Sequence, residues 1–205
     1  MKEQLIRLIT SIIAAMIIMI VHEMPKTLLY HWKEEKNKKL FPSIIKMHHF
    51  IDPIGLLLCV TSFAGFSKPY MYRIKNQKMN YLLGITGFLS LSTLCAVSIF
   101  VLKSVFHVRP DLNYPANIST LSLIGLYLVY HLAIISIGMI FVNLFPIATF
   151  DMGHIIAGKS PARFFFFIRN DYVLKITLII LIMLDIPTVL SLNFIQGCLS
   201  LLYNI

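Results

Sequence analysis

The chain has 205 residues, of which 58% are hydrophobic and 13% are charged, and its formal net charge is +9. Soluble domains carry about 25% charged residues, so this composition excludes an ordinary soluble protein and indicates an integral membrane protein. The positive charge falls in short clusters between apolar runs, as expected for loops beside a membrane, and we therefore expect no nucleic-acid partner. We expect one membrane domain covering residues 1–205, with the lipid bilayer as its surroundings.

Four long apolar segments predict membrane-spanning helices, because about 20 apolar residues are needed to cross the hydrocarbon core. They cover approximately residues 5–24, 80–104, 119–145 and 172–202. A shorter apolar segment at about 50–67, interrupted by proline and glycine, predicts a re-entrant segment between the first and second spans. The expected fold class is therefore an all-α integral membrane protein with about four transmembrane helices.

Two ionisable residues lie deep inside the predicted spans, His131 in the third and Asp185, close to Pro187, in the fourth. They are candidates for a polar pair across the bundle. We favour the other interpretation, that both side chains simply pack toward the bundle interior.

The basic residues predict the orientation of the chain. Of the 18 Lys and Arg residues, 14 lie between the first and second spans or around the connection between the third and fourth. Loops rich in Lys and Arg remain in the cytoplasm, so both termini are expected outside a multi-pass protein of the cell membrane.

Polar motifs stand at the cytoplasmic ends of the first and third spans. His22-Glu23 closes the first span, and Lys26 occupies the position where an HExxH zinc helix carries its second histidine. Pro25 disfavours regular helix at this point. The third span ends in Asn143-x-x-Pro146-x-x-x-x-Asp151, and an ionisable residue at membrane depth indicates function, although Asp151 also suits a helix N-cap.

Further motifs surround the short apolar segment. They are His49-x-x-Asp52-Pro53-x-Gly55 before it, Gly65-Phe66-x-Lys68-Pro69 after it, and Gly84-Ile85-Thr86-Gly87 in the next span. Taken alone, the first two are typical of turns.

In this order and at these spacings, the motifs resemble those of the site-2 protease family of intramembrane zinc metallopeptidases. The resemblance covers roughly residues 8–160. The chain departs from the family pattern with Phe66 for Trp, Phe88 for Pro, Met152 for Gly and, most seriously, Lys26 for His.

The resemblance implies a role for each matching residue. His22 and Asp151 would be zinc ligands, Glu23 the base that activates the metal-bound water, and Asn143 a group orienting the substrate backbone or the developing oxyanion. The substrate would be a membrane-embedded protein, cleaved near the cytoplasmic face.

The resemblance also implies that the re-entrant segment screens the site and binds an unwound substrate. Asp52, Pro53 and Gly55 would contribute to this binding. The expected partner is therefore a membrane-spanning protein, either as a substrate or as a bound partner.

Lys26 leaves two ligands where a catalytic zinc usually has three. Candidates for a third are His154, three residues after Asp151; His48 or His49 near the re-entrant segment; and His31, on the opposite side of the helix from His22. Two functions stay open, a zinc-dependent intramembrane endopeptidase and a non-catalytic relative that acts as a membrane adaptor or regulator.

Overall fold

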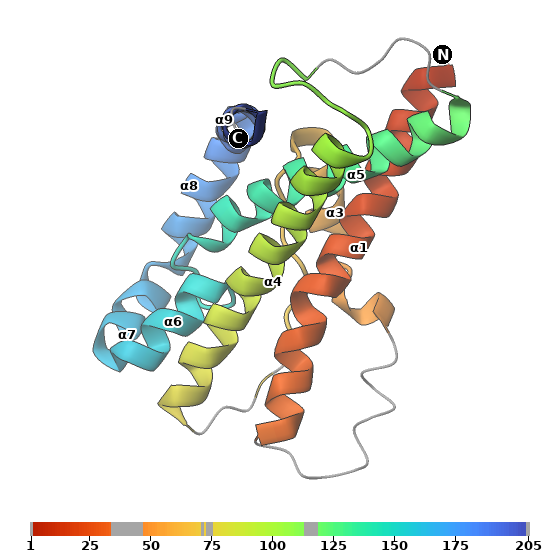
Figure 1. Ribbon diagram of the computed structural model, residues 1–205. Coiled ribbons are helices and arrows are strands. Elements are labelled where there is room, and N and C mark those ends of the chain that lie inside the picture. Colours follow the sequence, from red (N-terminus) through yellow and green to blue (C-terminus); the bar gives the residue numbers. More distant parts are fainter. Residues whose placement is uncertain (1, 34–46, 71, 73–75, 113–118, 204–205) are drawn as a thin grey trace.

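The computed structural model describes residues 2–33, 47–70, 72, 76–112 and 119–203, and every regular element within these ranges is helical (Figure 1). Much of the predicted basic loop, at 34–46 and 73–75, lies outside the described residues. The elements are α1 (Lys2–Lys33), η1 (Met47–Phe50), α3 (Pro53–Ser62), α4 (Gln77–Ser104), α5 (Thr120–Asn143), α6 (Asp151–Lys159), α7 (Pro161–Arg169), α8 (Asp171–Met183) and α9 (Ile186–Tyr203).

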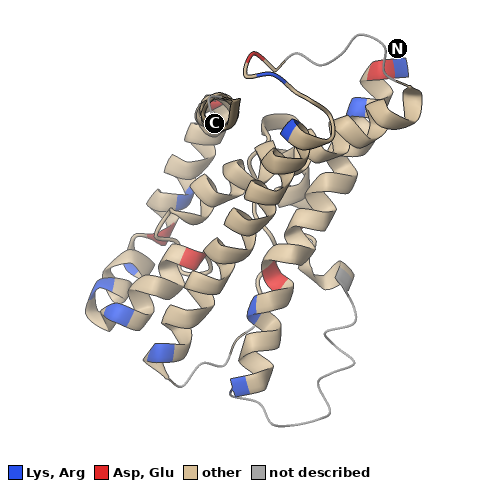
Figure 2. Ribbon diagram, in the orientation of Figure 1, with Lys and Arg blue, Asp and Glu red and all other residues tan. Residues whose placement is uncertain are grey.

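Four of these helices, α1, α4, α5 and α9, are long and apolar enough to cross a membrane. The predicted fold class, an all-α membrane protein with four transmembrane helices, is thereby confirmed. Figure 2 shows Lys and Arg toward the ends of the helices, with long stretches of α4 and α5 free of charge. Because charged side chains are costly within hydrocarbon, this distribution fits helices that cross a bilayer.

The predicted fourth span is wrong in one respect, because it is not a continuous helix. α8 ends at Met183 and α9 begins at Ile186, and Asp185 between them has a left-handed φ of 54°. Pro187 lies in the first turn of α9, where its missing N–H costs no helical hydrogen bond. The break leaves Asp185 exposed.

α1 is longer than predicted, running without interruption through Pro25 to Lys33. Buried side chains continue on one face beyond the proline, at Lys26, Thr27 and Tyr30. Tertiary packing of this face offsets the cost of the proline. His22 and Lys26 therefore keep helical spacing and lie on the same side of α1.

The apolar core lies where α1, α4, α5 and α9 meet. His131 belongs to this packing: its Nδ1 lies 3.1 Å from Thr10 Oγ1, and its ring stacks on Phe63 at 5.8 Å between centroids. The packing interpretation therefore holds for His131 but is wrong for Asp185, which is exposed at the α8–α9 break.

The segment around α3 has the hairpin geometry that a re-entrant segment requires. Asp52 accepts hydrogen bonds at 2.9 Å from the N–H groups of Ile54 and Gly55, which caps the helix. The returning chain donates from Lys68 N to Phe50 O at 2.9 Å, so the segment enters and leaves at the same end. Gly55 permits this return, because a Cβ there would lie 1.9 Å from the Phe66 carbonyl oxygen.

The orientation in the membrane is a prediction that fusion reporters test. A reporter inserted at Asn37 should be cytoplasmic and one fused after Ile205 external, because four crossings put both termini on the side opposite the basic loop. Both fusion points lie outside the described residues. Paired fluorescent and alkaline phosphatase fusions at each point give opposite signals, and a cytoplasmic C-terminus would contradict the four-span count.

Candidate functional site

Three side chains of the candidate site come from one turn of α1. His22, Glu23 and Lys26 are each 1% exposed. A buried lysine is unusual, because its ammonium loses hydration that only a close counter-charge can replace. The surroundings of Lys26 therefore define the site.

Asp151 provides one counter-charge from a distant part of the sequence. It is the first residue of α6 and is fully buried. Its backbone N–H lies 3.5 Å from Asn143 Oδ1, and the Asn143 amide donates to the Met139 carbonyl at 2.9 Å. The end of α5 thus holds the start of α6 in place.

Two glycines of α4 make room for Asp151. A Cβ on Gly87 would lie 2.3 Å from both carboxylate oxygens of Asp151, and one on Gly84 would lie 2.4 Å from its carbonyl oxygen. The small residues singled out in the sequence thus allow α6 to approach α4 closely.

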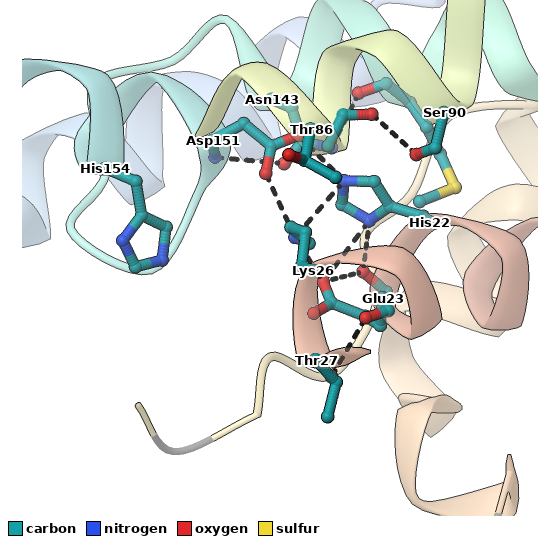
Figure 3. Close-up of polar contacts among 12 residues, drawn as sticks. His22, Glu23, Lys26, Thr27, Thr86, Ser90, Asn143, Asp151 and His154 are labelled. Carbon is teal, nitrogen blue, oxygen red and sulfur yellow. Dashed lines mark hydrogen bonds and ion pairs between the residues drawn. The ribbon is translucent and has the colours of Figure 1, made fainter. Parts of the chain in front are cut away.

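The Lys26 ammonium bridges two carboxylates (Figure 3). Its Nζ donates to Glu23 Oε1 at 2.7 Å and to Asp151 Oδ1 at 3.0 Å. Burial opposes ionisation of the Asp151 carboxyl, but the charges of Lys26 and His22 outweigh it and hold its pKa well below the usual range. The bridge is therefore a salt bridge between α1 and α6, inside the protein.

His22 joins the same two elements and also contacts the segment after α3. Its Nε2 lies 2.7 Å from Asp151 Oδ2, and its Nδ1 lies 2.7 Å from Ser67 Oγ. The Ser67 hydroxyl donates to Glu23 Oε1 at 2.8 Å. Ser67 is a member of the site that the sequence analysis missed.

The carboxylates fix the direction of two of these hydrogen bonds. A carboxylate only accepts, so His22 Nε2 donates to Asp151 Oδ2 and the Ser67 hydroxyl donates to Glu23 Oε1. Lys26 supplies the positive charge that both carboxylates share. We call His22, Glu23, Lys26, Ser67 and Asp151 the Lys26 cluster.

His154 lies beside the Lys26 cluster but not in it. Its Nδ1 is 3.3 Å from Asn80 Oδ1, and its ring contacts Tyr72 edge-on at 5.9 Å. Figure 3 shows its ring turned away from His22 and Lys26. Burial and the nearby Lys26 charge lower the pKa of His154 to about 4, so it is neutral near pH 7.

The remaining predicted residues have structural partners of their own. Asp52 caps α3 and Pro53 begins it. His48 and His49 stack on each other in η1, and His31 packs against the rings of Tyr30 and Tyr70. These contacts place the three histidines outside the Lys26 cluster.

The geometry of the cluster does not fit zinc. Zinc–ligand bonds of about 2.0–2.2 Å at tetrahedral angles would hold a nitrogen and an oxygen about 3.3 Å apart. His22 Nε2 and Asp151 Oδ2 are instead 2.7 Å apart and hydrogen-bonded. Across the described residues, no group of three or more His, Cys, Asp and Glu side chains is arranged to hold a metal ion.

Charge opposes zinc as well. An ammonium about 4 Å from a dication costs on the order of 8 kcal/mol at an effective dielectric constant of about 20. Lys26 Nζ lies 3.4 Å from Nε2 of His22, the residue that the family resemblance assigns to the metal. A zinc ion at His22 would therefore face the lysine at close range.

The order Ser67–His22–Asp151 resembles the connectivity of a serine hydrolase triad. In such a triad the serine donates its proton to the imidazole, which acts as the base. Here the hydroxyl donates to Glu23 Oε1. The proton of Ser67 is therefore not directed to the imidazole as it is in a triad.

Comparison with known proteins gives no further guide to this site. No family model matches the chain, and searches of curated proteins and of solved structures give no significant match.

The first prediction for the site concerns Gly87. Replacing Gly87 with Ala should lower the stability by about 1–3 kcal/mol, because the added methyl group collides with the Asp151 carboxylate. The measurement is thermal or denaturant unfolding of the purified protein in detergent. Gly197→Ala is the matched control: Gly197 is also helical, a Cβ there meets nothing within 4 Å, and the change should be neutral or slightly stabilising. Equal effects of the two substitutions would contradict the packing described here.

The second prediction concerns the buried charge. Lys26→Met should destabilise the protein by about 3–5 kcal/mol, because it leaves Glu23 and Asp151 without their shared cation. Lys33→Met, at the exposed end of the same helix, should change stability by less than about 0.5 kcal/mol. Unfolding curves that coincide for the two variants would show that the ammonium does not bridge the carboxylates.

Proposed function

We propose that this chain is a membrane protein of the site-2 protease type in which the Lys26 cluster takes the place of the zinc centre. It binds membrane-embedded segments of other proteins as an adaptor or regulator and does not cleave them. The observation that carries the proposal is the Lys26 ammonium, at hydrogen-bonding distance from both Glu23 and Asp151.

The family motifs support the first part of the proposal. Residues from three separate motifs, His22, Ser67 and Asp151, meet at one buried point, and Asn143 lies directly behind it. This convergence supports the proposal, because the resemblance predicts that residues of these separate motifs share one site.

The chemistry of the cluster supports the second part. Peptide hydrolysis in this family depends on a metal-bound water that a glutamate deprotonates. In this chain Glu23 Oε1 is engaged by both Lys26 and Ser67. Through Oε1 the glutamate neutralises the lysine, while its Oε2 is buried and has no hydrogen-bond partner among the described residues. The salt bridge through Oε1 favours a structural role over that of a base.

The segment around α3 supports the binding role. Ile54 and Leu57 on α3 are 66% and 63% exposed. The extended chain that follows α3 continues to Ser67, inside the cluster. A bound membrane segment would thus contact an apolar helix face connected directly to the charged site.

Zinc content tests the proposal. Purified wild-type protein should contain well under one zinc per chain by elemental mass spectrometry, because the ammonium occupies the position between the carboxylates. Lys26→His should raise the zinc content, since α1 is helical through Pro25 and two histidines four residues apart would share one face.

His22→Ala and Asp151→Ala, each combined with Lys26→His, are the controls and should remove the gained metal. Stoichiometric zinc in the wild type that is lost on His22→Ala would reject the proposal. It would favour instead the zinc peptidase, with Glu23 as the base. The third zinc ligand would then be a residue that does not lie at the site in this structure.

A further inference from the structure

A second feature, separate from the Lys26 cluster, is an apolar groove of about 630 Å³ between α4, α5 and α9. Its wall includes Phe100 of α4, Ile140 of α5 and Phe194 of α9, with Ser92 as its most polar lining residue. Two of the three cysteines, Cys95 and Cys198, also line it. All three helices that form it are long enough to cross the bilayer, so the groove faces lipid.

A cation, Lys103, lies at one end of this groove. Lys103, one turn beyond Phe100 and Ile99, donates a hydrogen bond to the Leu202 carbonyl. Its ammonium lies 5.7 Å from the centre of the Tyr203 ring. Both partners are neutral groups at the end of α9, a helix without any charged residue, so the charge of Lys103 is balanced by neither of them.

From these observations we infer that the groove binds one acyl chain of an anionic glycerophospholipid, with its phosphate at Lys103. The apolar walls suit the chain, and the ammonium suits the phosphate. Tyr203 is in the last turn of α9, and aromatic side chains at the ends of membrane spans commonly lie among lipid headgroups. The site is independent of the proposed zinc replacement, because none of its lining residues belongs to the Lys26 cluster.

The size of the groove suits a lipid chain. Its volume is about 630 Å³. It lies within the range of roughly 300–1,000 Å³ that is usual for small-molecule sites.

Native mass spectrometry of the purified full-length chain tests the site. The probes are a palmitoyl-oleoyl phosphatidylglycerol and the phosphatidylcholine with the same chains, titrated separately. We expect one tightly retained phosphatidylglycerol per chain and a clear preference for it over phosphatidylcholine. Lys103→Gln should weaken phosphatidylglycerol binding about fivefold and remove this preference, since one lysine near anionic lipid contributes about 1 kcal/mol.

Two variants serve as controls for this experiment. Lys78→Gln, which removes an exposed cation from the opposite end of α4, should leave the affinity unchanged. Ala96→Phe, which fills the groove from α4, should abolish tight binding of both lipids.

A diazirine at the end of the acyl chain locates the bound lipid. Crosslinks should concentrate on α4 near Cys95 and on α9 near Cys198. Crosslinks spread evenly over the lipid-facing helices, equal binding of the two lipids, or unchanged binding in Lys103→Gln would each overturn the inference. A co-purified protein that occupies the groove, mapped by the same crosslinks, would overturn it in favour of a helix partner.

Discussion

The contact of one ammonium with two carboxylates inside an apolar bundle constrains the rest of this structure. Removing each of these ions from water costs several kcal/mol, and the cost is offset only when opposite charges meet at hydrogen-bonding distance. Lys26 satisfies this condition with Glu23 on its own helix and with Asp151 on α6. The positions of α1 and α6 are therefore fixed relative to each other to within the tolerance of a hydrogen bond.

Several features that look unrelated in the sequence follow from this requirement. Gly87 lacks a side chain where Asp151 must enter, and Asn143 holds the backbone of Asp151. Ser67 closes the network by linking His22 to Glu23. Each of these residues comes from a different segment. The contacts around the cluster therefore join α1, α4, α5, α6 and the chain after α3 at one point. A buried ionic network of this kind specifies one arrangement of helices, even where apolar packing would give similar stability.

The helices could be predicted from sequence because their signal is local: hydropathy over about 20 residues identified the spans. That His22, Glu23 and Asp151 share a site was predicted from the family resemblance, because no local signal connects residues so far apart in the sequence. Ser67 could not be found in this way, because a serine in an extended segment has no characteristic spacing. Its position two residues after Gly65, in a segment that the resemblance had already marked, was the only available signal.

The two departures in helix boundaries have one physical origin. Proline is disfavoured within a helix, yet α1 continues through Pro25 while the fourth predicted span breaks near Pro187. Around Pro25 the following face of the helix is buried, at Lys26, Thr27 and Tyr30, and that packing holds the helix together. Before Pro187, Asp185 and Ile186 are exposed and no comparable packing opposes the break. The sequence shows where each proline lies but not whether the neighbouring side chains are buried, and that burial decides whether the helix breaks there.

The proposed replacement of zinc by Lys26 separates two properties that a metal centre combines. A dication at this point would hold the two carboxylates together, and the Lys26 ammonium holds them together by donating to Glu23 Oε1 and Asp151 Oδ1. The link between α1 and α6 is therefore made without a metal. A catalytic zinc also keeps one position open for a water molecule that it activates, and an ammonium supplies no such activation. Under the proposal, the exchange keeps the link between the two helices and removes the means of activating a nucleophile.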